Sequence, residues 1–175
     1  MSSPFEQHLL PHLDAAYNLA RWLLRDAHEA EDAVQEACLR AFRAMDRFRG
    51  GEGRPWLLTI VRNECYSRLR RMRREPGGEV FEDGLHGSEN AEQEIWRQGW
   101  REMRAEWVRQ ALERLPAELR EAIVLHEIEE LSYREIAAIA AVPIGTVMSR
   151  LSRARHRLHA ELTQLDREES ARGDR

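Results

Sequence analysis

Arginine is the residue type in this sequence whose distribution most clearly indicates chemistry. All 27 lysine-or-arginine positions are arginine, and a guanidinium offers a planar fork of donors that pairs with phosphates or guanine edges. Seven arginines and one acid lie between Arg54 and Arg74, and four arginines and no acid lie between Pro143 and His159. Because the net charge is −4, any contact with nucleic acid must come from such local basic surfaces. An all-arginine usage is equally what a GC-rich genome encodes.

An acidic stretch separates the two basic blocks. Residues 75–95 contain seven acids and no arginine, together with several glycines, which is a composition typical of a linker. We therefore expect a first domain over residues 1–75 and a linker over 76–104, in which a helix resumes near residue 91. A second domain over 105–165 and a frayed polar tail over 166–175 should follow.

The spacing of apolar residues predicts an all-α protein of two small helical domains joined by a flexible acidic linker. Leu13, Tyr17, Ala20 and Leu24 recur every three or four residues, and no long stretch alternates with a period of two. The first helical segment should run to about residue 25, and Asp26 should cap a second helix that continues to about residue 47. A third should follow a glycine-rich turn, from about residue 55 to residue 74.

The second half of the sequence predicts a helix-turn-helix. A helix should begin at Pro116, and Ser132 with Glu135 forms a capping box that opens a short helix ending near residue 140. Pro143 lies in the tight connection that follows, and a longer helix is expected from Gly145 to about residue 162. A short helix, a turn of about four residues and a longer helix that enters the major groove define this motif.

Polar and basic side chains follow the outward side of the last helix, while Val147, Leu151 and Ala154 face inward. Arginine grips guanine or phosphate and serine adapts to either, although exposed arginines are also common as simple solvated charges. The candidate duplex-binding residues are Thr146, Met148, Ser149, Arg150, Ser152, Arg153, Arg155 and Arg157.

Stretches in both halves of the sequence resemble the extracytoplasmic-function sigma factors, which belong to the sigma-70 family. Residues 131–137 and 145–155 resemble the family's domain that reads the promoter −35 element. Residues 30–37 resemble its polymerase-binding helix, and residues 56–63 resemble its −10-reading helix. Both halves occurring in this order make the resemblance highly specific.

The resemblance implies a polymerase-binding face on the second helix. Asp32, Gln35, Glu36 and Leu39 lie three or four residues apart, so they share one side of that helix. In the family such a face meets a basic coiled coil of the largest polymerase subunit. The residues alone are also compatible with an ordinary solvated acidic face.

The resemblance further implies that the third helix handles an opened −10 element. Asn63 matches the family position associated with a pocket for a captured base, which needs hydrogen-bonding groups and nearby positive charge. Arg62, Arg68, Arg70 and Arg71 are the candidate phosphate contacts. As alternatives, Asn63 is a surface or capping residue, and Trp56 is more often a core residue than a stacking platform. Met148 departs from the family, which often has a basic residue there.

The function implied by the resemblance is that of a stress-response sigma factor that directs polymerase core to promoter DNA and is held by an anti-sigma factor. The alternatives are a stand-alone helix-turn-helix regulator and a pure protein-interaction module. We expect no enzymatic activity, because no Walker lysine or hydrolase motif is present, and no cofactor or small-molecule substrate. His8 and His12 lack a third ligand, so no metal is expected. No apolar run has the roughly 20 residues needed to cross a bilayer, so a cytoplasmic protein is expected. Cys38 and Cys65 should be reduced and should serve as core or half-buried fillers.

Overall fold

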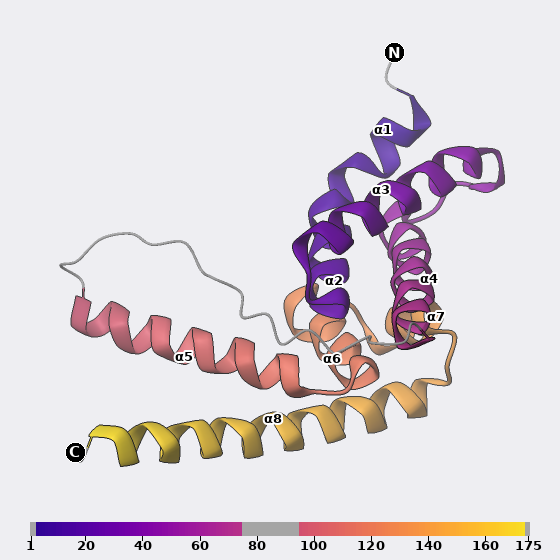
Figure 1. The fold of residues 1–175 in the computed structure, drawn as a ribbon. Helices are drawn as coiled ribbons and strands as arrows, with labels where there is room; N and C mark the ends of the chain where they lie inside the picture. The colour runs from indigo at the N-terminus through magenta and orange to yellow at the C-terminus, as the bar shows by residue number, and fades with distance from the viewer. Residues whose placement is uncertain (1–2, 75–94, 174–175) are drawn as a thin grey trace.

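A computed structural model describes residues 3–74 and 95–173. The first domain is built around three helices that pack on one another, α2, α3 and α4, with a short N-terminal segment beside them (Figure 1). Its elements are α1 (Pro4–His8), the 3-10 turn η1 (Leu10–His12), α2 (Leu13–Leu24), α3 (Ala27–Arg43), the 3-10 turn η2 (Met45–Arg47) and α4 (Gly53–Arg74).

The second domain packs α6 and α7 against α8, while α5 and α8 lie side by side and project away from the first domain (Figure 1). Within the described residues every regular element is helical, which confirms the all-α prediction. The elements of this domain are α5 (Ile95–Arg114), α6 (Ala117–Ile123), the π-helical turn η3 (Val124–Ile128), α7 (Tyr133–Ala140) and α8 (Ile144–Gly173).

The predicted helix caps are present. Asp26 Oδ1 accepts the backbone N–H of Glu29 at 2.8 Å and so begins α3. Ser132 Oγ accepts the N–H of Glu135 at 3.2 Å, and Glu135 accepts the N–H of Ser132 at 2.7 Å. This reciprocal box satisfies two backbone donors at the start of α7 and sets where the helix-turn-helix begins.

Replacing Ser132 with alanine should destabilise the protein by about 1 kcal/mol, because one donor at the start of α7 loses its partner. For a chain of this size we expect the melting temperature to fall by about 2–4 °C, as measured by circular dichroism. Ser67→Ala, at an exposed position inside α4, is the matched control and should leave the melting temperature unchanged. Equal decreases in both variants would contradict a capping role.

The last helix is longer than the sequence predicted. We expected it to end near Leu162 with a frayed tail, but α8 continues to Gly173. Leu165 is only 7% exposed, and it lines a small cleft together with Trp107 of α5. Arg114 of α5 also forms an ion pair with Glu161 of α8 at 3.0 Å. These contacts with α5 therefore stabilise the C-terminal part of α8, although that part is polar in composition.

The third helix begins at Gly53, earlier than the predicted start at Pro55. A Cβ at residue 53 would lie 2.0 Å from the carbonyl oxygen of His8, so only glycine permits the N-terminal segment to approach α4 this closely.

Both domains contribute to a single cluster of buried apolar residues. It includes Leu19 and Leu57 from the first domain and Leu125, Ile136 and Leu151 from the second. α2 contacts α6, and α4 contacts α7. Cys65 is buried and Cys38 is half-buried, as predicted. The domains of this structure therefore share a common core.

Among the described residues, no single helix is both long enough and apolar enough to cross a membrane; only the bent pair of α7 and α8, taken together, meets those two measures.

Candidate nucleic-acid interface

The turn between α7 and α8 fixes which face of α8 is available to a ligand. Ala141 has the left-handed conformation (φ 53°, ψ 48°), and Val142 donates its N–H to Ala137 O at 3.1 Å, so the chain reverses over a few residues. Val147 and Leu151 are 1% exposed and Ala154 is fully buried. These three residues face the domain interior as predicted, and the opposite side of α8 is left to solvent.

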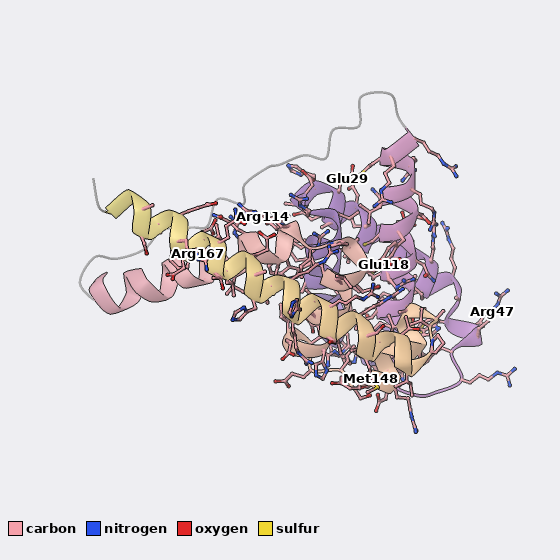
Figure 2. All side chains as sticks on the ribbon, turned by 90° about the horizontal axis from the view of Figure 1, so that it is seen from below. Glu29, Arg47, Arg114, Glu118, Met148 and Arg167 are labelled. Atoms are coloured by element: carbon pink, nitrogen blue, oxygen red, sulfur yellow. The ribbon has the colours of Figure 1, made fainter. Side chains whose placement is uncertain are left out.

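Most of the predicted −35 residues lie on that open side. Figure 2 shows Met148 at the surface near the beginning of α8, where its side chain is 53% exposed. Thr146 and Arg150 are instead half-buried. The exposed members of the predicted set are Met148, Ser149, Ser152, Arg153, Arg155 and Arg157.

The four arginines of α8 between Pro143 and His159 differ in their partners. Arg150 is 12% exposed at its side chain and lies 3.6 Å from a carboxylate oxygen of Glu118. Arg155 forms a 2.7 Å ion pair with Glu127, and this contact holds the pKa of the Glu127 carboxyl below its usual value. Arg153 is exposed and donates only to the backbone oxygen of Ser149, at 3.4 Å.

Of the four arginines between Pro143 and His159, Arg153 and Arg157 have no carboxylate partner among the described residues. A guanidinium that is exposed and unpaired does not have to break an internal ion pair before it contacts DNA, so these two side chains are the best placed to contact a base edge or a phosphate.

The predicted −10 residues of α4 fall into two groups. Asn63, Arg70 and Arg71 are exposed. Arg62 and Arg68 have side chains that are each 15% exposed and are engaged by carboxylates. The structure thus leaves three of the five predicted residues open to a ligand in this arrangement.

Arg68 has a structural environment that its position in the sequence did not reveal. It forms ion pairs with Glu64 at 2.9 Å and with Glu29 of α3 at 2.8 Å. Glu64 is 4% exposed, and Arg40 of α3 approaches its second oxygen at 3.0 Å. Burial by itself would lower the pKa of Arg68, but the hydrogen bonds and charges of Glu29 and Glu64 together raise it above its usual value. Arg68 therefore joins α4 to α3.

Replacing Arg68 with glutamine should reduce the free energy of unfolding by about 3 kcal/mol, because the buried Glu64 carboxylate loses its main counter-charge. A urea titration followed by circular dichroism measures this loss. Arg70→Gln makes the same chemical change at an exposed position and should alter stability by no more than about 0.5 kcal/mol. If both variants unfold at the same urea concentration, Arg68 does not join the two helices.

The predicted polymerase-binding residues share one side of α3. Asp32, Gln35 and Leu39 are exposed, and Glu36 is bonded to Arg40 at 3.2 Å. Phe42, which was not among the predicted residues, also belongs to this face, because it lies three residues after Leu39. Phe42 is 62% exposed, and Leu39 is 50% exposed. The rings of Phe42 and Phe5 pack edge to face, with their centroids 5.7 Å apart. The face thus has an apolar end beside its acids.

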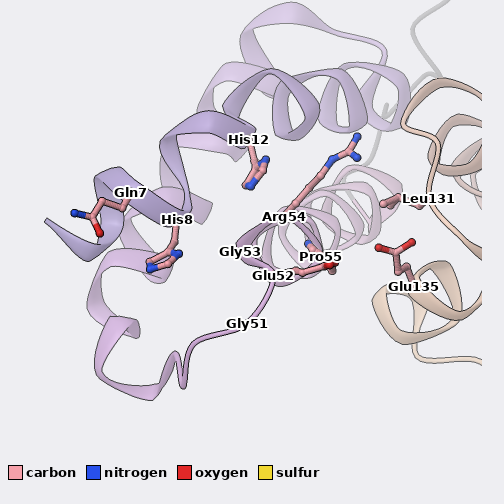
Figure 3. A pocket seen from close by; sticks show the side chains of 10 residues that line it. All are labelled: Gln7, His8, His12, Gly51, Glu52, Gly53, Arg54, Pro55, Leu131 and Glu135. Atoms are coloured by element: carbon pink, nitrogen blue, oxygen red, sulfur yellow. The ribbon is translucent and has the colours of Figure 1, made fainter. Parts of the chain in front are cut away.

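A cleft of about 340 Å³ lies between the N-terminal segment, the start of α4 and the capping box of α7. Figure 3 shows His8, His12 and Arg54 on one side and Glu135 on the other. Burial, and then the charge of Arg54, lower the pKa of His12. In the described part of the chain, no three His, Cys, Asp or Glu side chains come together as a metal site would require.

Both domains match known protein families, and the chain as a whole is similar to proteins of those families. Residues 9–75 match the family described as Sigma-70 region 2, and residues 105–168 match the family described as Sigma-70, region 4. The chain is 38% identical over 153 residues to the RNA polymerase sigma-H factor of Pseudomonas aeruginosa, which covers 83% of this chain and 79% of that protein. It is 38% identical over 150 residues to the ECF RNA polymerase sigma-E factor of Escherichia coli K12, with coverages of 79% and 76%.

Two solved structures are similar over both domains together. One is the sigma factor RpoE of Bartonella quintana in complex with the anti-sigma factor NepR, with a TM-score of 0.75 and 35% identity over 91% of this chain and 96% of that chain. The other is CnrH in complex with the cytosolic domain of CnrY, with a TM-score of 0.63, 26% identity and coverages of 91% and 88%.

Proposed function

Because this chain belongs to the extracytoplasmic-function sigma factors of the sigma-70 family, we propose that it binds RNA polymerase core through α3 and recognises the promoter with α4 and α8. The observation that carries this proposal is the order of three surfaces in one chain. An exposed acidic and apolar face on α3 precedes an arginine-rich α4, and a helix-turn-helix with exposed arginines follows. The chain itself performs no catalysis; polymerase makes the RNA.

The α3 face has the chemistry expected of a docking site for a basic partner. Leu39 and Phe42 supply exposed apolar area, and Asp32 and Glu36 supply negative charge next to it. Interfaces of this kind gain most of their affinity from a few apolar anchors, while the surrounding charges guide encounter and orientation. We assign the basic coiled coil of the largest polymerase subunit as the partner.

The −35 element is assigned to α8 and the −10 element to α4. Arg153 and Arg157 lie on the exposed side of α8. A recognition helix inserts such a side into the major groove of DNA. On α4, the exposed Asn63 offers an amide to a base outside the stack, and Arg70 and Arg71 offer charge to its backbone.

We also propose that an anti-sigma factor controls this chain in the cytoplasm. The solved RpoE structure, which is similar over both domains, is a complex with such a factor. A stand-alone helix-turn-helix regulator would share the second domain only, and it would have no use for the exposed acidic and apolar face of α3.

The test of this function is run-off transcription from a pooled promoter library with purified polymerase core. We expect transcripts that appear only when this chain is added, from templates that share two short elements at a constant spacing. Absence of such transcripts, together with failure to co-elute with core, would leave a DNA-binding regulator as the function.

A further inference from the structure

The −10 helix of the first domain is in direct contact with a buried acid of the second domain. Arg62 of α4 donates to both carboxylate oxygens of Glu121, through Nε to Oε1 and through Nη2 to Oε2 at 3.4 Å. The Tyr66 hydroxyl donates to Oε2 at 3.1 Å. The Glu121 side chain is 1% exposed, and burial raises the pKa of its carboxyl while Arg62 opposes that rise. Donors from the other domain therefore compensate for its loss of water.

Arg120, the neighbour of Glu121, ties the same helix to another part of the first domain. It is 4% exposed and donates to the carbonyls of Glu113 at 2.8 Å and Leu115 at 3.0 Å. Its Nη2 also reaches the carbonyl of Leu23, at 3.4 Å, in the last turn of α2. Carbonyl groups at a helix C-terminus carry partial negative charge, which suits a guanidinium.

A second carboxylate of the second domain, directly after η3, also accepts hydrogen bonds from the first domain. Glu129 is 6% exposed and accepts hydrogen bonds from Arg54 at 2.6 Å and from the Asn18 side chain at 3.3 Å. Glu121 and Glu129 both belong to the second domain, and the hydrogen bonds described for their carboxylates all come from the first. Polar contacts thus reinforce the apolar cluster that the domains share.

This closed arrangement is too small to read a whole promoter. Elements at −35 and −10 are separated by about 25 base pairs, or ~85 Å at 3.4 Å per base pair. The helices α4 and α8 both contact α7, and α8, with its 30 residues, is only ~45 Å long. The domains must therefore separate before both elements can be bound.

On the premise of the function proposed for this chain, we propose that Glu121 forms an intramolecular latch. By this we mean that its carboxylate binds the Arg62 guanidinium, which would otherwise contact a phosphate of the −10 element. Carboxylates and phosphates both accept the two parallel N–H groups of an arginine, so they compete for the same fork. Among the described residues, Arg62 is the one of the four predicted −10 arginines whose carboxylate partner lies in the other domain. The second domain therefore inhibits the first until the two separate.

The test is Glu121→Gln in the full chain, which keeps the size of the side chain and removes its charge. Arg62 then lacks its buried counter-charge, so the closed state should lose population. We expect a larger radius of gyration by small-angle X-ray scattering. We also expect about tenfold tighter binding, without core, to the single-stranded −10 segment of a promoter recovered by run-off transcription.

The matched control is Glu118→Gln, on the same helix. The Glu118 side chain is 62% exposed, and its ion pair is with Arg150 of its own domain, so this variant should keep the radius of gyration and the DNA affinity of the unmodified chain. Circular dichroism must show that the variants retain their helices. If Glu121→Gln does not fold, Glu129→Gln removes the other cross-domain carboxylate and should produce the same opening.

An unchanged radius of gyration and unchanged DNA affinity in a folded Glu121→Gln chain would overturn the latch, and continued transcription would show that the proposed function stands. If the unmodified chain supports no transcription, the proposed function fails, but the radius of gyration still reports on the latch: expansion supports domain opening, and no expansion overturns it.

Discussion

Replacing Leu39 with arginine should weaken binding to polymerase core by about 30-fold or more, which corresponds to ~2 kcal/mol at an apolar anchor of an interface. Leu39 is 50% exposed on α3, so the substitution costs the fold little, but it places positive charge where a basic partner is expected to dock. Fluorescence anisotropy of the labelled chain titrated with purified core gives the dissociation constant.

The matched control for this prediction is Leu10→Arg. Leu10 is another exposed leucine of the first domain, at 44%, and it lies in η1, outside the α3 face. Its replacement should leave core affinity within about twofold, as for a typical surface substitution. If both variants lose affinity equally, added positive charge rather than the α3 face is responsible, and the assignment of the face fails.

Replacing Arg153 with alanine should reduce recognition of the −35 element by about tenfold, within the 1–3 kcal/mol expected for one bidentate contact to a base pair. Arg153 is exposed on the open side of α8, and within the described part of the chain its one hydrogen bond is to a backbone oxygen of its own helix, so the fold does not depend on it. The measurement is the ratio of run-off transcripts from an intact promoter and from one with a mutated −35 element.

Two further measurements separate base recognition from other roles of Arg153. Arg167→Ala, on the same helix but beyond the helix-turn-helix, should leave the transcript ratio unchanged. Core affinity of Arg153→Ala should also be unchanged, because α3 is intact. An unaltered ratio in Arg153→Ala would remove Arg153 from the base contacts. Equal losses on both promoters would instead indicate a phosphate contact.

The caps and faces of individual helices were predictable because they depend on residues within one or two turns. The Ser132 and Glu135 side chains are three positions apart, and their reciprocal hydrogen bonds are present. The inward side of α8 follows from the spacing of Val147, Leu151 and Ala154, all of which are buried. The end of α8 was missed because its stability past Leu162 depends on α5, which lies far away in the sequence.

The sequence by itself determined the all-α class, the helix-turn-helix, the family resemblance and which side chains share a helix face. Only the tertiary structure decided which of the candidate arginines are free. Arg62 meets Glu121 across 59 positions and Arg68 meets Glu29 across 39. Helical periodicity acts over a few residues and identifies a face, whereas an ion-pair partner on another helix is set by how the helices pack. A charge that looks available in the sequence can therefore be neutralised by the fold.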